Sequence, residues 1–302
     1  MQWSAETFQV SIPEIYQLEL SNKCNLKCPA CIRMHPLVKR SVGFVSFDLI
    51  ESMVRRGDFE GSYFIELQMY GEALLHPGFG KIVSYLKSSS GVKLGMSTNG
   101  TLIYKNLDSI SELDFLTISV DSANKGRYES LRLGSSFDKL IHGIEELLNR
   151  DPRPVIDLQV IEFYGKDKEL STLTELSQRR QWNVTCRSVP DCFAAYQDRP
   201  YPKRNLQELC LNPWLSVSIH WDGDVVPCCF SAGKYIVYGN LSKMSMADIW
   251  DKNPVRDALR DRMRSNYNIS NMPCSKCYMR SPALLHLKML MQNIRILGGS
   301  SE

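Results

Sequence analysis

The chain has 302 residues, of which 43% are hydrophobic and 23% are charged, and its formal net charge is +3. These proportions are typical of a globular protein, and the length is enough for one large core or for two domains. No basic run stands out, so nucleic acid is not indicated as a partner, although the charge pattern does not exclude it.

The N-terminus and the cysteine content bear on localisation. The first residues, MQWSAE, lack the cationic start and apolar core of a secretory signal. No run of about 18 or more apolar residues occurs, so we expect no membrane span. The ten cysteines fall mainly at metal-ligand spacings, in a chain too long for a small exported disulfide scaffold. We therefore predict a cytoplasmic protein whose cysteines bind metal.

The first two-thirds of the chain alternate between short apolar strands and amphipathic helices. Ser46 is placed to cap a helix that runs through Arg56 and ends at Gly57, and a second helix is predicted from Phe137 to Leu148. Six strands in this alternation predict a parallel sheet with helices outside it, either a partial TIM-like barrel or an open doubly wound sheet. The predicted strands are Tyr16–Leu20, Tyr63–Met69, Val92–Ser97, Phe115–Val120, Ile156–Glu162 and Asn183–Ser188.

Three cysteines directly follow the first predicted strand, in the pattern CxxxCxxC: Cys24, Cys28 and Cys31. Three ligands are one fewer than a closed tetrahedral metal site needs. A 4Fe–4S cluster held by three thiolates keeps one iron open to an outside ligand. The alternative is that these thiols are three ligands of a zinc site.

Polar residues follow or end the next four predicted strands. Because chemistry gathers at the C-terminal ends of the strands in a βα barrel, we expect these groups to lie at one rim. One strand that ends in polar residues is typical of an ordinary turn. Five successive strands that end in polar residues or cysteines favour a functional site. The groups are Tyr70-Gly71-Glu72, Ser97-Thr98-Asn99-Gly100, Ser119-Val120-Asp121-Ser122, and Gln159 with Glu162.

The pattern changes in the last third. Residues 198–204 are polar and contain prolines, which is typical of a linker, so we expect domains at 1–196 and 197–302. Trp214–His220 alternates like a strand, and a tight turn at 221–224 leads to a return strand that begins at Val225. A helix containing Ile249 and Trp250 follows, and residues 284–297 form an amphipathic stretch that we expect to pack on the barrel or on a partner subunit.

A second set of cysteines surrounds this predicted hairpin: Cys210, Cys228, Cys274 and Cys277. Four thiolates in this arrangement suit an iron–sulfur cluster or a zinc site that staples a small domain. Cys186, Cys192 and Cys229 remain, and Cys186 is predicted to be a small buried hydrophobe.

The CxxxCxxC motif and the strand-end segments together resemble the radical S-adenosylmethionine (SAM) superfamily. The resemblance implies a partial (β/α)6 TIM-like barrel in which SAM binds the open iron of the cluster. It also implies that Gly71 and Glu72 engage the SAM amine, and that Arg132 contacts the SAM carboxylate; the alternative for Arg132 is a surface ion pair. The further SAM contacts implied are Ser97, Asn99, Ser119, Asp121 and Gln159.

This sequence departs from the family pattern at two points. Tyr70 stands where the family has the first of two glycines before the glutamate. Ala30 stands before the third cysteine, where relatives often have an aromatic residue near the adenine, so adenine must be covered by another group.

The second half resembles the SPASM/twitch extension of radical SAM enzymes, a small α+β unit with a β-hairpin and helices. The full SPASM form needs about seven cysteines for two auxiliary clusters. The twitch form, with one auxiliary 4Fe–4S cluster, fits Cys210, Cys228, Cys274 and Cys277 better, because no cysteine follows Cys277. Cys229 is a candidate hydrogen-atom donor to a product radical.

The resemblance implies an oxidoreductase or epimerase that cleaves SAM reductively to a 5′-deoxyadenosyl radical, with an electron from a donor such as flavodoxin or ferredoxin. The radical then takes a hydrogen atom from the substrate. Only about 15 residues precede the first predicted strand, too few for a leader-binding domain. This favours a small polyhydroxy substrate such as a sugar or aminocyclitol over a ribosomally made peptide. The remaining alternative is a non-catalytic electron carrier or a zinc-stabilised binding module.

Overall fold

The computed structural model of the chain describes residues 11–34, 38–162, 168–190, 210–229, 231, 233, 236–264 and 274. Several predicted features lie outside these residues: the linker at 198–204, the domain boundary at 196/197, Cys192, Cys277 and the amphipathic stretch at 284–297.

One nine-stranded sheet runs through the described part of the molecule in the order β6-β5-β4-β3-β2-β1-β7-β8-β9. Strands β1 to β6 follow one another across the sheet and pair in parallel, as the βα alternation predicts. Their bounds are β1 Ile15–Leu18, β2 Phe64–Leu67, β3 Lys93–Thr98, β4 Phe115–Ser119, β5 Val155–Glu162 and β6 Thr185–Pro190.

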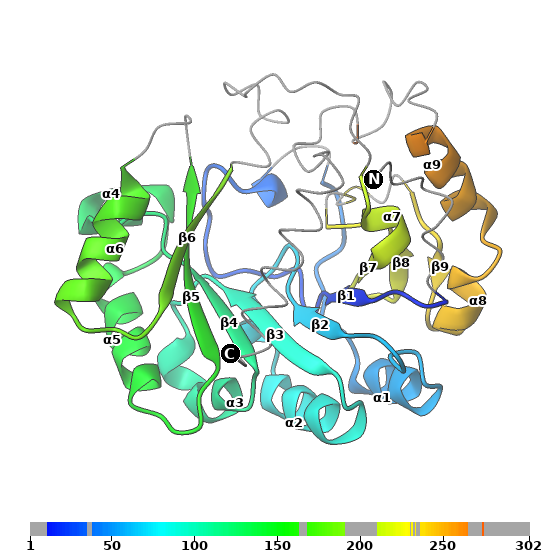
Figure 1. The fold of residues 1–302 in the computed structure, drawn as a ribbon, viewed down its shortest axis with the longest axis horizontal. Coiled ribbons are helices and arrows are strands. Elements are labelled where there is room, and N and C mark those ends of the chain that lie inside the picture. Colours follow the sequence, from blue (N-terminus) through cyan, green and yellow to red (C-terminus); the bar gives the residue numbers. More distant parts are fainter. Residues whose placement is uncertain are drawn as a thin grey trace, which may run out of the picture.

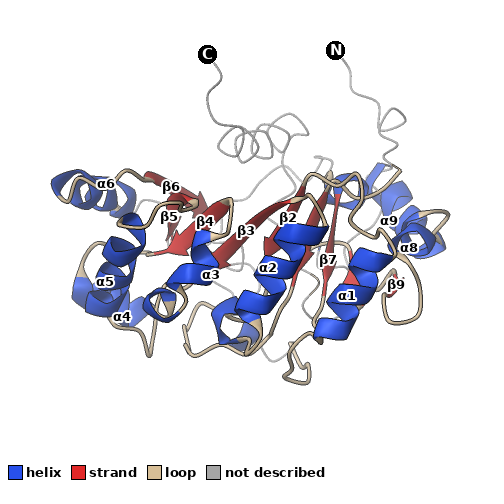
Figure 2. Cartoon of the chain, turned by 90° about the horizontal axis from the view of Figure 1, so that it is seen from below, coloured by secondary structure: helices blue, strands red, loops and turns tan. Residues whose placement is uncertain are grey.

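Helices lie along one face of this sheet (Figures 1 and 2). An open doubly wound sheet would carry helices on both faces, so the arrangement is that of a partial TIM-like barrel, and the predicted α/β class is confirmed. The helices along the barrel are α1 Phe47–Arg55, α2 Phe79–Ser89, α3 Leu107–Ser111, α4 Lys125–Leu131, α5 Phe137–Leu148 and α6 Glu169–Arg179; short 3₁₀ turns are η2 Ile32–Met34, η3 Ala73–Leu75 and η4 Ile103–Lys105.

The helix boundaries follow the capping signals in the sequence. Ser46 accepts a hydrogen bond from the Leu49 amide at 3.2 Å and so caps α1. Gly57, with φ of +73°, ends that helical segment because this backbone region is open mainly to glycine. Helix α5 has the predicted bounds and is capped by Ser136.

Strands β1 and β2 present apolar side chains to the helices and place a polar side chain in the middle of the opposite face. On β1, Tyr16 and Leu18 are fully buried, whereas Gln17 between them belongs to the other face. Strand β2 repeats the pattern, with Ile65 and Leu67 fully buried and Glu66 on the opposite side. The core therefore lies between the sheet and the helices, which leaves the other face of the strands for chemistry.

The C-terminal part continues the same sheet. Strand β7 (Ser216–Ile219) pairs in parallel with β1, and β8 (Asp224–Val226) turns back antiparallel to it, which confirms the predicted hairpin. Strand β9 (Gly239–Asn240) pairs with β8. The helices of this part are α7 Asn212–Leu215, α8 Met246–Trp250 and α9 Pro254–Arg264.

The start of this hairpin differs from the expectation. Trp214 and Leu215 belong to α7, not to the strand, because Pro213 in the first turn favours a helix start. The alternation seen from Trp214 onwards was therefore misleading. All four residues of β7 are buried, so this strand is covered on both faces.

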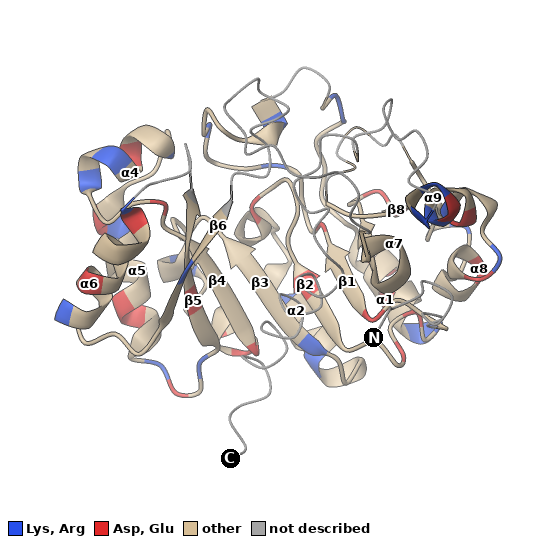
Figure 3. Cartoon of the chain, turned by 45° about the horizontal axis from the view of Figure 1, so that its top comes forward, with Lys and Arg blue, Asp and Glu red and all other residues tan. Residues whose placement is uncertain are grey.

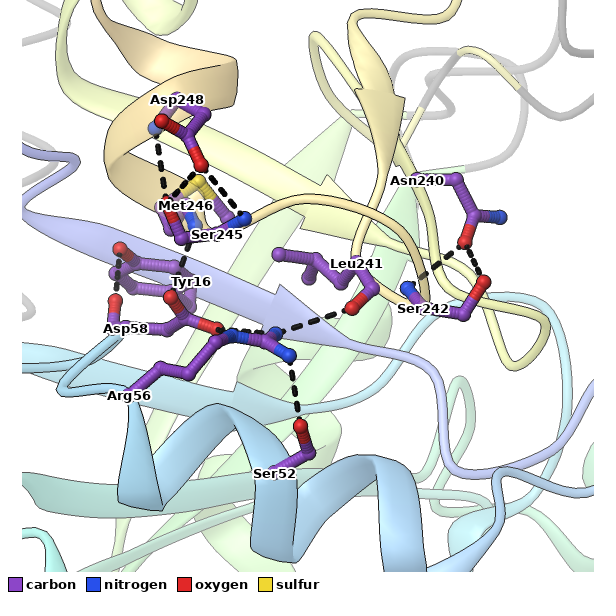
Figure 4. A network of polar contacts seen from close by, with 10 residues as sticks. All are labelled: Tyr16, Ser52, Arg56, Asp58, Asn240, Leu241, Ser242, Ser245, Met246 and Asp248. Carbon is purple, nitrogen blue, oxygen red and sulfur yellow. Dashed lines mark hydrogen bonds and ion pairs between the residues drawn. The ribbon is translucent and has the colours of Figure 1, made fainter.

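A buried polar network joins α1 to the C-terminal extension (Figure 4). Asp58, which is 5% exposed, accepts hydrogen bonds from the Met246 amide at 2.8 Å and from Arg56 at 2.6 and 3.0 Å. Arg56 also donates to the Leu241 carbonyl at 3.0 Å, and the Tyr16 hydroxyl donates to the Asp58 carbonyl at 2.6 Å. The network fixes α8 against the barrel.

Candidate functional site

The loop after β1 carries Cys24, Cys28 and Cys31, each of them half-buried. The loop is held to the segment after α4 by a hydrogen bond from the Lys27 amide to the Leu133 carbonyl at 2.9 Å. Burial raises the pKa of Cys28 to about 11, Cys31 and Cys24 add to the rise, and Arg132 opposes it. The structure thus brings the three predicted ligands within electrostatic range of one another.

Gly71 packs directly on the start of this loop. A Cβ atom at Gly71 would lie 1.9 Å from the Ser21 carbonyl oxygen and 2.7 Å from that of Lys23. The next amide, of Glu72, donates to the Lys23 carbonyl at 2.8 Å. The glycine is required because backbone approaches backbone here, and this close approach holds the cysteine loop against the end of β2.

The Glu72 carboxylate faces the end of β3. It accepts hydrogen bonds from the Thr98 hydroxyl at 2.7 Å, the Asn99 amide at 2.8 Å and the Leu74 amide at 3.3 Å. Glu72 is 2% exposed, and burial raises its pKa although these hydrogen bonds oppose the rise. These contacts make Glu72 an internal brace between β2 and β3, and its predicted contact with the SAM amine stays a prediction.

Asn99 links this brace to the cysteines. Its side-chain amide donates to the Cys24 sulfur at 3.7 Å and to the Asn25 side-chain oxygen Oδ1 at 3.0 Å. Its own amide oxygen accepts from the Thr101 hydroxyl at 2.6 Å. Asn25 was not predicted as a site residue, and its position between two predicted ligands was the available signal.

Asp121 and Arg132 form an ion pair beside the cysteine loop. The Arg132 guanidinium donates through Nε and Nη2 to one Asp121 oxygen, at 2.7 and 2.6 Å. The other Asp121 oxygen accepts from the Ile161 amide at 3.0 Å, and Asp121 has φ of +56°. The Arg132 side chain is only 11% exposed. The alternative of a surface ion pair is therefore wrong, because both side chains are largely shielded from solvent and lie within electrostatic range of Cys28. The predicted contact of Arg132 with the SAM carboxylate stays a prediction.

Ser97, Ser119 and Gln159 belong to the face opposite the helices. The Ser97 hydroxyl donates to Glu66 at 3.1 Å. Ser119 and Gln159 are register partners on β4 and β5. The Gln159 carbonyl accepts from the Val120 amide at 2.9 Å. The structure thus places the predicted strand-end residues on neighbouring strands, and their contacts with SAM stay predictions.

Sequence reasoning missed the polar side chains deeper on the same face. Charged residues lie mostly on helices and loops (Figure 3), which makes the few within strands distinctive. Arg187 on β6 pairs with Asp157 on β5, and Asp157 is fully buried. The available signal was a polar residue in the middle of several of the apolar strands, such as Glu66, Thr117 and Asp157.

The cysteines of the extension come from separate elements. Cys210, before α7, is 7% exposed, whereas Cys228, Cys229 and Cys274 are half-buried. Cys277 lies outside the described residues. Tyr238, between β8 and β9, is within electrostatic range of Cys228 and Cys274, since both thiols add to the rise that burial causes in its pKa. Two of the predicted ligands thus lie within electrostatic range of the same tyrosine.

Several buried donors lack acceptors among the described residues, and two of them, Tyr70 and Tyr238, are within electrostatic range of Cys228. The hydroxyls of Tyr70 and Tyr238 and the Trp214 indole nitrogen have no hydrogen-bond partner within the described part of the chain. Buried donors normally find an acceptor. A group rich in sulfur acceptors, such as an iron–sulfur cluster, fits this environment.

No three His, Cys, Asp or Glu side chains among the described residues converge tightly enough to hold a single metal ion. Each cysteine of a 4Fe–4S cluster binds a different iron, so cluster ligands need not converge on one point. The lack of a single-ion site among the described residues is therefore compatible with cluster binding.

Two family models match the chain. The radical SAM superfamily matches residues 18–161, and an iron–sulfur cluster-binding domain of the SPASM type matches residues 210–278. The chain belongs to the radical SAM superfamily. The two matches cover the barrel with its three cysteines and the extension from Cys210 through Cys277.

Similar proteins differ in what they act on. The chain is 27% identical over 168 residues to a GTP 3′,8-cyclase of Alkaliphilus metalliredigens, a match that spans 54% of this chain and 52% of that protein. The chain therefore matches only about half the length of the first curated relatives. BtrN in complex with AdoMet and 2-DOIA has a TM-score of 0.62 at 16% identity, covering 88% of this chain and 93% of that one.

A second solved structure, Streptococcus suis SuiB bound to the precursor peptide SuiA, has a TM-score of 0.69 at 13% identity. It covers 93% of this chain and 74% of that chain. At these identities the two structures support the fold alone: a partial barrel with a small C-terminal extension.

The matched domains imply a 4Fe–4S cluster with SAM at the barrel and auxiliary iron–sulfur binding in the extension. In the barrel, Cys24, Cys28 and Cys31 are the residues that would hold the cluster, and Asn99 and Arg132 lie next to them. In the extension, Cys228 and Cys274 are each within electrostatic range of Tyr238. Among the described residues, no helix is both long and apolar enough to cross a membrane.

Proposed function

We propose that this radical SAM protein takes a hydrogen atom from a C–H bond of a small polyhydroxy substrate, such as a sugar or aminocyclitol, and so oxidises or epimerises it with the aid of one auxiliary cluster. When bound, SAM and the barrel cluster supply a 5′-deoxyadenosyl radical by one-electron cleavage of the sulfonium. The chain itself must hold the substrate, orient one C–H bond and exclude water.

The observation that carries the proposal is the polar face of the barrel sheet. Strand register aligns Ser97 with Thr117, and Thr117 with Asp157, in a row across β3, β4 and β5. A second row joins Ser119 to Gln159, and Gln159 to Arg187. Hydroxyl, amide, carboxylate and guanidinium groups therefore stand side by side on the face that the helices leave uncovered.

This face offers both donors and acceptors. The Ser218 hydroxyl donates to the Gln17 side-chain oxygen at 2.7 Å, and the Ser97 hydroxyl donates to Glu66. Burial raises the pKa of Glu66, and hydrogen bonds from Ser97 and the charge of Arg187 oppose the rise. Glu66 has no ion-pair partner among the described residues. Alternating donors and acceptors suit a ligand with several hydroxyls, or with an amine that Glu66 can bind.

The substrate radical can react in two ways. In an oxidation it loses one electron to the auxiliary cluster and one proton to a base, which leaves a carbon–oxygen double bond. In an epimerisation it receives a hydrogen atom on the opposite face, for which we propose the Cys229 thiol. The thiyl radical left on Cys229 then takes up one electron, ultimately from the flavodoxin- or ferredoxin-type donor, and one proton to restore the thiol. Cys229 is half-buried and lies within electrostatic range of the Tyr70 ring, close to the barrel.

The test uses anaerobic protein with intact clusters, excess reductant and SAM. We expect 5′-deoxyadenosine to form, and deuterium to enter it from deuterated cyclitols, aminocyclitols or sugars. Cys28→Ala protein, which lacks a ligand of the barrel cluster, is the control and should form none. Deuterium transfer only from synthetic peptides would instead support the alternative of peptide epimerisation or crosslinking.

The non-catalytic alternative makes a different prediction. An electron carrier or a zinc-stabilised module would yield no 5′-deoxyadenosine above the Cys28→Ala control. Iron and zinc analysis of the same preparation separates these outcomes, because two 4Fe–4S clusters hold about eight irons and a zinc module holds none in the extension.

A further inference from the structure

Tyr70 occupies a position between the two cysteine groups of the molecule. It lies three residues after the end of β2 and precedes Gly71, whose backbone packs on the start of the loop that carries Cys24, Cys28 and Cys31. Its ring packs in a small cluster with Ile32, the residue after Cys31. On the other side, the ring meets His220 of the extension edge to face, with centroids 6.4 Å apart. Tyr70 therefore touches both the barrel loop and the hairpin that leads to Cys228.

The Tyr70 hydroxyl is buried and lacks a hydrogen-bond acceptor in the described part of the structure. Only 6% of the residue is exposed. Burial raises the pKa of Tyr70, and the nearby thiols of Cys229 and Cys228 add to the rise. A buried hydroxyl without an acceptor costs free energy, so its retention beside two cysteines calls for an acceptor between them.

Tyr238 repeats this situation from the extension. It is 5% exposed, and its hydroxyl also lacks an acceptor among the described residues. Its backbone is fixed on both sides: its amide donates to the Val225 carbonyl at 2.7 Å, and its carbonyl accepts from Asn253 at 2.7 Å. Cys228 is the cysteine that lies near both tyrosines. Two rigidly held donors, one from the barrel and one from the extension, are thus within electrostatic range of the same predicted ligand.

We propose that the hydroxyls of Tyr70 and Tyr238 donate hydrogen bonds to sulfur atoms of the auxiliary cluster at Cys228, and that they raise its reduction potential. The sulfur atoms of a 4Fe–4S cluster, both sulfide and thiolate, are acceptors. Reduction adds negative charge to them, so a hydrogen bond stabilises the reduced cluster more than the oxidised one. A barrel residue thereby helps to set how readily the extension accepts an electron.

The proposal goes beyond the reaction proposed above, because it holds for any substrate. It also gives a role to the tyrosine that replaces the glycine usual at this position of the family. A glycine there offers no side chain to the extension, whereas Tyr70 spans the distance to the hairpin. His220 and Arg40, whose guanidinium lies 6.0 Å from the Tyr70 ring centroid, hold the ring in place.

The experiment isolates the auxiliary cluster. In full-length protein with Cys24, Cys28 and Cys31 all replaced by Ala, the remaining iron–sulfur signal comes from the extension. Its potential is measured by anaerobic redox titration followed by electron paramagnetic resonance, with and without Tyr70→Phe or Tyr238→Phe. We expect each substitution to lower the equilibrium constant for reduction about tenfold, which is about 59 mV for a one-electron couple.

Tyr85→Phe is the matched control, because it removes a hydroxyl from a half-buried ring on α2 that packs on Phe47. It should leave the potential unchanged. A second readout uses the native protein and does not depend on the stability of a variant. In pulsed electron paramagnetic resonance, the reduced auxiliary cluster should show hyperfine couplings to exchangeable protons in H₂O, and these couplings should disappear in D₂O.

The outcomes separate clearly. Lower potentials in Tyr70→Phe and Tyr238→Phe, with loss of an exchangeable proton coupling in each, support the proposal. An unchanged potential in both, an equal shift in Tyr85→Phe, or a native cluster without exchangeable couplings would overturn it. An extension that binds zinc and no iron would overturn it as well. None of these results depends on turnover, so a failure here is distinguishable from a failure of the proposed reaction.

Discussion

Asp58 is the residue whose loss should most weaken the attachment of the extension. Its side chain is 1% exposed and joins three segments: Arg56 at the end of α1, the Met246 amide at the start of α8 and, through Arg56, the Leu241 carbonyl. The predicted perturbation is Asp58→Ala, with Asp58→Asn as a conservative partner that keeps one acceptor oxygen for Met246.

The expected magnitude follows from the two groups left behind. The buried Met246 amide loses its acceptor, which costs about 1–3 kcal/mol. Arg56 loses its partner but is 30% exposed, so water compensates and the loss is about 1 kcal/mol or less. Together these give about 3 kcal/mol for Asp58→Ala, or about a hundredfold in a local opening equilibrium. Asp58→Asn, which loses mainly the charge, should cost about 1 kcal/mol.

Hydrogen exchange of the anaerobic holoprotein, read by mass spectrometry, is the suitable assay. Global unfolding of a cluster protein is not two-state, whereas exchange reports local opening directly. Peptides covering 241–250 should exchange about a hundredfold faster in Asp58→Ala, with little change in α5. The control is Asp108→Ala, which removes an ion pair with Arg150 at a site where Asp108 is 89% exposed, and it should change nothing.

The reasoning would be refuted by unchanged protection of residues 241–250 in Asp58→Ala. It would also be refuted if protection fell equally throughout the barrel, because Asp58 would then support the whole fold instead of the junction with α8.

Three further outcomes are expected. Gly71→Ala should abolish SAM-cluster loading while the extension keeps its iron, because the added methyl would collide with the Ser21 carbonyl; normal iron content would contradict this close approach. Arg132→Lys should bind SAM at least tenfold more weakly in equilibrium binding, since one ammonium cannot reproduce the two-nitrogen contact with Asp121; unchanged affinity would count against the pair as a SAM-site element. Cys229→Ala should still form 5′-deoxyadenosine but lose solvent deuterium incorporation into an epimerised product, and unchanged turnover with unchanged product would end the donor proposal.

The barrel was predictable because its signals are local. Period-two alternation on β1 and β2 and the caps at Ser46 and Ser136 act within a few residues, and the structure follows them closely. The predicted strand start at Trp214 was wrong because Pro213 favours a helical turn there. A short alternating pattern of apolar residues does not reveal such a turn.

The site was predictable only in part, because much of it depends on partners distant in sequence. The sequence places Glu72 and Asn99 at strand ends, but it does not reveal that Glu72 is bound by the Asn99 amide and Thr98 and so braces two strands. Nor does it reveal that Asp121 and Arg132 pair in the interior. The continuation of the sheet from β1 to β7 joins residues about 200 positions apart and carries no local signal.

The pairing of β7 with β1 has a consequence for electron transfer. The loop with Cys24 emerges from β1, and the hairpin leading to Cys228 begins with β7, so adjacent rungs of one ladder fix both attachment points. Four aligned residue pairs would have to break before those points could separate. Electron tunnelling falls off steeply with distance. The shared ladder fixes the two attachment points relative to each other. Clusters bound at the two cysteine groups would therefore exchange electrons at a rate set by their potentials, without waiting for a domain movement.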